Sequence, residues 1–98
     1  MEIIIERRAE IAFRSLDKNE QKKITHSLSA ISNIDRKELV LEPKLHKLAT
    51  GFSDKKLYSY RGSPKYRLIL SFEEEFCIVE DIVDHDRLNR LFVKKGEA

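Results

Sequence analysis

The chain has 98 residues, of which 41% are hydrophobic and 37% are charged, and its formal net charge is +2 at pH 7. This balance excludes a disordered or collagen-like chain and is typical of one domain with its own core. No apolar run approaches the roughly 18 residues of a membrane-spanning helix, and the acid-first N-terminus lacks the order of a secretory signal. We therefore expect one cytoplasmic domain, residues 1–98.

The first half of the chain predicts a strand followed by two helices. Three consecutive isoleucines within residues 2–6 favour a strand that is buried on both faces. Apolar residues then recur at helical spacing over residues 7–16. A second helix should begin at Asp17, which forms a capping-box pattern with Glu20, and should end near Asn33.

The second half predicts three strands and a short helix, after an irregular segment over residues 35–53. Residues 57–61 and 66–72 form two strands, and in the second of them apolar and mixed side chains alternate between the two faces. A tight acidic turn leads to a third strand over residues 76–83, and the helix runs over residues 86–93. The order β-α-α-β-β-β-α predicts an α+β fold, in which an N-terminal helical hairpin and a short C-terminal helix cover one face of a mostly antiparallel, four-stranded sheet.

Cysteine and histidine usage bears on cofactors. The only cysteine, Cys77, lies in an apolar run, which predicts a buried thiol and excludes an intramolecular disulfide. One cysteine and three dispersed histidines do not make a structural zinc site, and the glycine loops that bind nucleotide phosphates are absent. The sequence therefore predicts neither a metal nor a cofactor.

Charge is strongly segregated along the chain. Residues 44–67 contain seven Lys or Arg and one acid, whereas residues 73–86 contain seven acids and neither Lys nor Arg. Such segregation can give one surface a positive potential. The alternative is that neighbouring strands share these charges across the sheet.

Four segments, in this order, resemble the RelE/ParE toxin superfamily of bacterial toxin–antitoxin systems. They are Lys44–Leu48, Leu57–Arg61, Tyr66–Leu70 and Ile82–Arg87, followed by Phe92. The most specific parts are the two strands with a tyrosine–arginine pair and the histidine before the last helix. The resemblance spans nearly the whole chain and implies a small basic toxin that an antitoxin neutralises.

Within this superfamily, RelE-like members cut mRNA in the ribosomal A site, whereas ParE-like members share the fold and inhibit DNA gyrase without nuclease residues. Cutting RNA without a metal needs a base, an acid and cations that hold the phosphate. The resemblance places Arg67 as the phosphate-binding cation and His85 as the acid or base. Further cations that would bind RNA are Arg61, Lys65, Arg87, Lys55 and Lys56.

Arg67 and His85 also have a purely structural interpretation. Arg67 would instead pair with Glu80 or Asp81 on the neighbouring strand, and His85 would simply begin a helix whose N-cap is Asp84 or Asp86.

Two aromatic residues allow two interpretations as well. Tyr58 and Tyr60 would stack on RNA bases or, in the interpretation we favour, belong to the core, because they share one face of a strand.

Three positions depart from the fullest nuclease pattern of the superfamily. Tyr58–Tyr60 stands where some ribosome-dependent members carry a lysine pair, and Phe92 stands where many carry a tyrosine. Asp86 stands where several carry an arginine, with Arg87 one position later.

We expect a ribosome-dependent, metal-independent mRNA endonuclease that is bound by a cognate antitoxin. The alternatives are a DNA gyrase inhibitor without nuclease activity and an inactive toxin-fold binding partner. A stripe of Ile31, Ile34 and Leu39 would be exposed to receive the antitoxin or, alternatively, buried within the domain.

Overall fold

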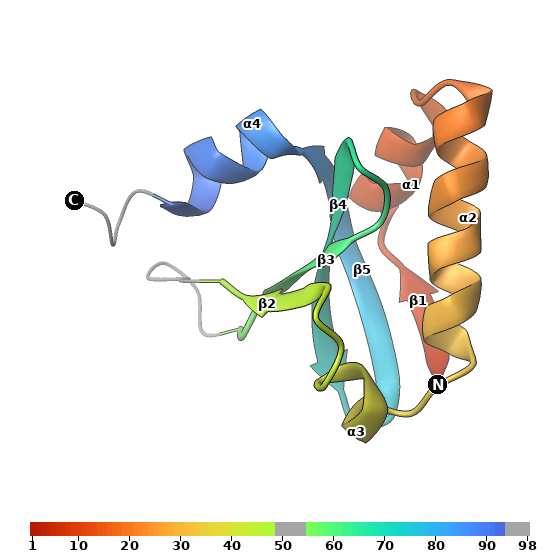
Figure 1. Ribbon diagram of the computed structural model, residues 1–98, viewed down its shortest axis with the longest axis vertical. Helices are drawn as coiled ribbons and strands as arrows, with labels where there is room; N and C mark the ends of the chain where they lie inside the picture. Colours follow the sequence, from red (N-terminus) through yellow and green to blue (C-terminus); the bar gives the residue numbers. More distant parts are fainter. Residues whose placement is uncertain (49–54, 94–98) are drawn as a thin grey trace.

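The computed structural model describes residues 1–48 and 55–93. In this part of the chain, five strands form one sheet in the order β1-β5-β4-β3-β2, with β1 parallel to β5 and all other pairs antiparallel (Figure 1). The elements are β1 (Glu2–Ile5), α1 (Arg7–Arg14), α2 (Lys18–Ser32), α3 (Arg36–Leu39), β2 (Leu45–Lys47), β3 (Tyr58–Arg61), β4 (Tyr66–Glu73), β5 (Phe76–Asp84), α4 (His85–Leu88) and a π-helical turn η1 (Asn89–Val93). The predicted α+β class and the mostly antiparallel sheet are confirmed.

The predicted number of strands was wrong. Leu45–Lys47 adds a fifth strand, β2, which pairs with β3 at the edge of the sheet. The short helix α3 was also missed, although Asp35 and Glu38 form a complete capping box. Elements of three or four residues are too short for a hydrophobic period to show, so both were read as irregular chain.

β1 is an edge strand, so the prediction that it is buried on both faces was wrong. It pairs with β5 alone in the described sheet, and Ile4 and Ile5 are 41% and 45% exposed. Ile3 packs against the core. Consecutive isoleucines thus identified a strand but not its place in the sheet.

The main core lies between the sheet and the helices α1 and α2, which lie together on one side of the sheet (Figure 1). Tyr60 is 4% exposed, and the ring of Tyr58 meets that of Phe72 edge-on at 5.4 Å, which confirms core packing for both tyrosines. The predicted burial of Cys77 is also confirmed. The buried residues of the main core are Ala9, Ile24, Ile31, Leu39, Tyr60, Leu68, Leu70, Cys77, Val79 and Ile82.

The suggested antitoxin stripe is part of this core. Ile31 and Leu39 are fully buried, and Ile34 packs against the same cluster. Their proposed exposure was therefore wrong and the alternative of burial holds, because Ile31 of α2 and Leu39 of α3 both pack within the main core.

The opposite face of the sheet, which we call the open face, is covered only in part. α4 lies on this side, away from α1 and α2, and Leu88 packs with Ile69 and Val83 in a small second cluster (Figure 1). The prediction that all helices cover one face of the sheet was therefore wrong. No helix among the described residues is long and apolar enough to cross a membrane.

Candidate functional site

The turn between β3 and β4 begins at Gly62, where the chain runs close beneath α2. A Cβ atom at this position would lie 2.7 Å from Cδ1 of Ile24 and 3.1 Å from Cγ of Leu68, so only glycine fits without displacement. The backbone N–H groups of Gly62 and Ser63 both donate to the carbonyl of Tyr66, at 3.1 Å each. These bonds close the turn over Pro64 and Lys65.

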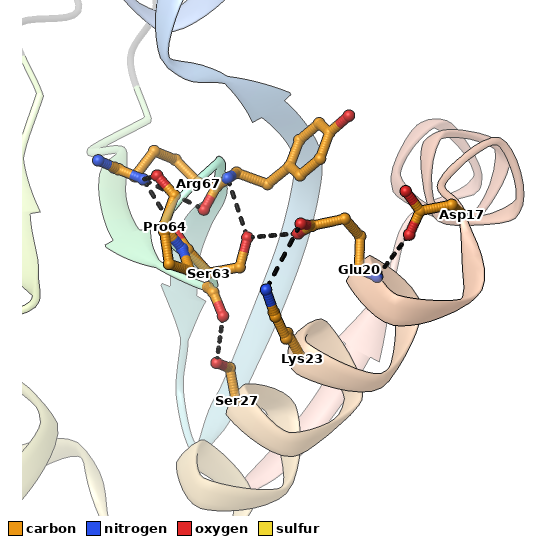
Figure 2. A network of polar contacts seen from close by, with 9 residues as sticks. Asp17, Glu20, Lys23, Ser27, Ser63, Pro64 and Arg67 are labelled. Atoms are coloured by element: carbon orange, nitrogen blue, oxygen red, sulfur yellow. Dashed lines mark hydrogen bonds and ion pairs between the residues drawn. The ribbon is translucent and has the colours of Figure 1, made fainter.

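Helix α2 holds this turn through two of its side chains (Figure 2). The hydroxyl of Ser27 donates to the carbonyl of Gly62 at 2.6 Å. The hydroxyl of Ser63 donates to Oε1 of Glu20 at 2.8 Å and accepts the backbone N–H of Tyr66 at 3.0 Å. Because Glu20 and Ser27 are seven residues apart, they lie on one face of the helix, two turns from each other.

The guanidinium of Arg67 lies against the carbonyls of the same turn (Figure 2). Its Nη1 donates to the carbonyl oxygens of Ser63 at 3.1 Å, Pro64 at 3.3 Å and Tyr66 at 3.4 Å. Carbonyl dipoles orient the group, and no carboxylate in the described part of the chain forms an ion pair with it. The turn therefore presents a fixed cation, which is what an oxyanion or a phosphate requires.

The predicted pairing of Arg67 with Glu80 or Asp81 does not occur. Glu80 accepts hydrogen bonds from Lys55 at 2.9 Å and from the Ser71 hydroxyl. Asp81 accepts from the backbone N–H of Ile82 at 2.8 Å, beside the register shift between β4 and β5.

A second arginine lies directly across the strand pair from Arg67. Arg61 of β3 is its register partner, so the two side chains leave neighbouring strands on the open face. The pKa of Arg67 is lowered, first by burial and then by the positive charge of Arg61. Both causes disfavour the charged form and would be offset by an anion bound between the two groups.

His85 is the first residue of α4 and is exposed. Asp84 is the N-cap, since its Oδ1 accepts the backbone N–H of Arg87 at 2.8 Å, so this carboxylate caps the helix as the structural interpretation expected. Arg67 pairs with Val83, two residues before His85, which brings Arg67 and His85 to the same end of the sheet. Within the described residues the imidazole makes no hydrogen bond or ion pair.

The remaining predicted cations divide into two groups. Arg61, Lys65, Arg87 and Lys56 are exposed, and the Lys65 ammonium lies 5.9 Å from the Tyr66 ring centroid. Lys55 differs, because its ion pair with Glu80 compensates its charge. The hydrogen bond to Glu80 and then the Coulomb attraction of this carboxylate raise the pKa of Lys55.

Several residues of the site were not singled out from the sequence. Glu20, Ser27 and Ser63 hold the turn, and nothing in their spacing indicates that they meet. His46 is the register partner of Ser59, which shares the open face with Arg61, so it adds an exposed imidazole to that side. It was missed because β2 was missed.

The described residues contain no group of three or more His, Cys, Asp or Glu side chains that could hold a metal. The arrangement instead combines fixed guanidinium groups with an exposed imidazole.

No protein-family model and no curated protein matches this sequence. Solved structures do match in fold. A chain of the archaeal RelE–RelB complex from Pyrococcus horikoshii OT3 has a TM-score of 0.66 at 23% identity, covering 88% of this chain and 96% of that chain. The YoeB dimer from Staphylococcus aureus has a TM-score of 0.62 at 23% identity, covering 87% and 97%.

YafQ from E. coli has the same fold, with a TM-score of 0.55 at 18% identity, and the match covers 89% of this chain and 96% of YafQ. The chain thus has the RelE-like fold, and this agrees with the resemblance found in the sequence.

Proposed function

We propose that this chain, built on the RelE-like fold, is the toxin of a type II toxin–antitoxin system and cleaves mRNA at the ribosome without a metal. The observation that carries the proposal is the guanidinium of Arg67, fixed by turn carbonyls beside Arg61, at the end of the sheet where His85 begins α4. The fold, shared with RelE, YoeB and YafQ, supports it.

In this reaction the 2′-hydroxyl of the RNA attacks the adjacent phosphorus, and the bond from phosphorus to the 5′-oxygen breaks. A proton leaves the 2′-hydroxyl, and another is delivered to the departing 5′-oxygen. Negative charge builds on the phosphate oxygens meanwhile. Arg67 and Arg61 would stabilise that charge, because a fixed, partly desolvated guanidinium needs little reorganisation to do so.

His85 would carry one of the two protons, because an imidazole changes its charge near neutral pH. The phosphate would lie between the guanidinium of Arg67 and the imidazole of His85, on the open face. Arg87, Lys65 and Lys56 would add RNA-binding charge, whereas the predicted contribution of Lys55 is reduced by its ion pair with Glu80.

An antitoxin partner follows from the same assignment. Two of the structures that share the fold are complexes, RelE with RelB and YoeB with YefM. We propose that this chain is likewise held by a cognate antitoxin in the cytoplasm, and that the antitoxin leaves the open face inaccessible to RNA.

The test is induced expression followed by primer extension across abundant transcripts. Wild type should stop translation and leave discrete cleavage sites, whereas Arg67→Ala and His85→Ala should remove both effects. Arg14→Ala, which deletes an exposed arginine of α1, is the matched control and should behave as wild type.

Three results would overturn the nuclease assignment. Full toxicity of both site variants would show that neither side chain is needed. Intact transcripts with an induced DNA-damage response would identify a gyrase inhibitor instead, and the absence of any growth effect would identify an inactive binding protein.

A further inference from the structure

A shallow hollow of about 460 Å³ lies between α2 and the β3–β4 turn, on the other side of the turn from Arg67. Its lining includes four lysines or arginines and one histidine, namely Lys22, Lys23, Lys44, Arg61 and His26. Buried Ser27, Gly62 and Ser63 form its floor together with Pro64. No carboxylate is among the lining residues, so the hollow concentrates positive charge, and we call it the α2 groove.

The helical repeat explains why so many cations meet here. Lys22 and His26 are four residues apart, as are Lys23 and Ser27, so each pair shares one face of α2. Lys18 continues the first row by another turn and lines a neighbouring hollow together with Lys22 and His26. Successive residues of this row are about 6 Å apart along the axis.

The carboxylates at the start of α2 do little to neutralise these charges. Asp17 is occupied as the N-cap, where it accepts the backbone N–H of Glu20 at 2.8 Å. Glu20 accepts the Ser63 hydroxyl and lies 3.8 Å from the ammonium of Lys23. An ion pair of this length near the surface contributes little, so most of the positive charge remains available.

Arg61 lies at the boundary between the α2 groove and the open face, which carries the proposed cleavage site. It lines the groove and is also the cross-strand partner of Arg67. A chain with regularly repeated negative charges would therefore meet the lysines of the groove and then the two arginines of the open face. A single small anion would satisfy only part of this row.

We propose that the α2 groove binds the sugar–phosphate backbone of the single-stranded RNA that Arg67 and His85 cleave, a few nucleotides from the scissile bond. This inference rests on the proposed function and adds a second contact region to it. The contacts are to phosphates rather than to bases, because lysines at a hydroxyl-lined, shallow floor provide charge without base-stacking surfaces. The groove therefore increases affinity without selecting sequence.

The experiment measures fluorescence anisotropy of a short fluorescein-labelled single-stranded RNA. It uses the full chain with Arg67→Ala and His85→Ala, so that no cleavage occurs. The groove variant adds Lys22→Gln and Lys44→Gln, and the matched control adds Arg14→Gln and Lys37→Gln, which remove the same charge from exposed positions outside the groove.

The groove variant should bind on the order of tenfold more weakly than its parent. The slope of log K against log salt should flatten by about 1.4, since each phosphate contact to a single strand contributes about 0.7. In the control variant, the affinity should stay within about twofold of the parent's, and the salt slope should stay within about 0.3 of the parent's.

Equal losses in groove and control variants would overturn the inference, because net charge alone would then explain binding. Unchanged binding by the groove variant would overturn it as well. Competition by polyglutamate as effective as by unlabelled RNA would identify an acidic peptide as the occupant. This outcome is distinguishable from failure of the nuclease proposal, because the assay measures RNA binding by a variant that lacks Arg67 and His85. The binding result therefore does not depend on whether the wild-type protein cleaves RNA.

Discussion

The hydroxyl of Ser63 lies 2.8 Å from Oε1 of Glu20, and through this bond helix α2 fixes the turn that receives Arg67. The same hydroxyl accepts the backbone N–H of Tyr66 at 3.0 Å. One serine therefore joins the helical layer to the first residue of β4, next to the arginine that is proposed to hold the phosphate.

Ser63→Ala should slow RNA cleavage on the order of tenfold, because Arg67 loses its fixed position. It should also lower the free energy of unfolding by roughly 1–3 kcal/mol, since the Tyr66 N–H is left without its acceptor. Single-turnover cleavage at saturating protein separates the rate from the affinity. Glu20→Gln keeps an acceptor and should retain most of the rate. A loss in affinity without a loss in rate would contradict the positioning role.

Arg61→Ala should make the protein more stable and less active. Removing Arg61 relieves its repulsion with Arg67, and like charges directly opposite in a sheet destabilise by roughly 0.2–1 kcal/mol. Inorganic phosphate should raise the thermal midpoint of wild type more than that of Arg61→Ala, because the anion bridges both guanidinium groups. Lys37→Ala, in α3, is the control. Lower stability of Arg61→Ala at low salt would show that the arginines do not repel.

Gly62→Ala should destabilise the protein by roughly 1–3 kcal/mol, because the new methyl group meets Cδ1 of Ile24 at 2.7 Å. Ile24→Val deletes that atom and alone should cost roughly 0.5–1.5 kcal/mol. The double variant should be more stable than the sum of the two single changes predicts, as urea unfolding can measure. Strict additivity would mean that the contact with Leu68, rather than with Ile24, limits the position.

The fold was predictable where periodicity extends over a whole element. α2 and β4 carry long, regular apolar patterns, and both were predicted within a few residues. β2 and α3 have three and four residues, so no period develops in them. The place of β1 at the edge depends on pairing partners that are seventy residues or more away, which local sequence does not specify.

The site was predictable in its charged residues and not in the residues that position them. Arg67 and His85 were proposed from a resemblance, and the register places both at one end of the sheet. Neither interpretation of Arg67 anticipated its carbonyl contacts, because these depend on the conformation of the turn. Ser27 and Glu20 reach that turn from α2 across more than thirty residues of sequence, which only the tertiary fold specifies.

Glu74→Gly should stabilise the protein by up to about 1 kcal/mol, because Glu74 has a φ of 53° in the tight turn between β4 and β5. The hydrogen bond of Arg36 to the Glu74 carbonyl uses the backbone and is kept. Glu75→Gly, one position later and without a positive φ, is the control and should destabilise slightly. Unfolding in urea measures both. Equal effects of the two substitutions would show that the left-handed conformation carries no strain.

The thiol of Cys77 should remain unreactive in the native protein up to strongly alkaline pH. Burial raises its pKa to about 11, and only the thiolate reacts readily with thiol reagents. At pH values between the ordinary thiol pKa of 9.0 and about 11, the unfolded chain loses this proton and the folded chain keeps it. Stability should therefore fall as pH rises through this range, by about 3 kcal/mol, and Cys77→Ala should lack this part of the decline. Rapid labelling of native protein by Ellman's reagent at pH 8 would instead place the thiol in contact with solvent.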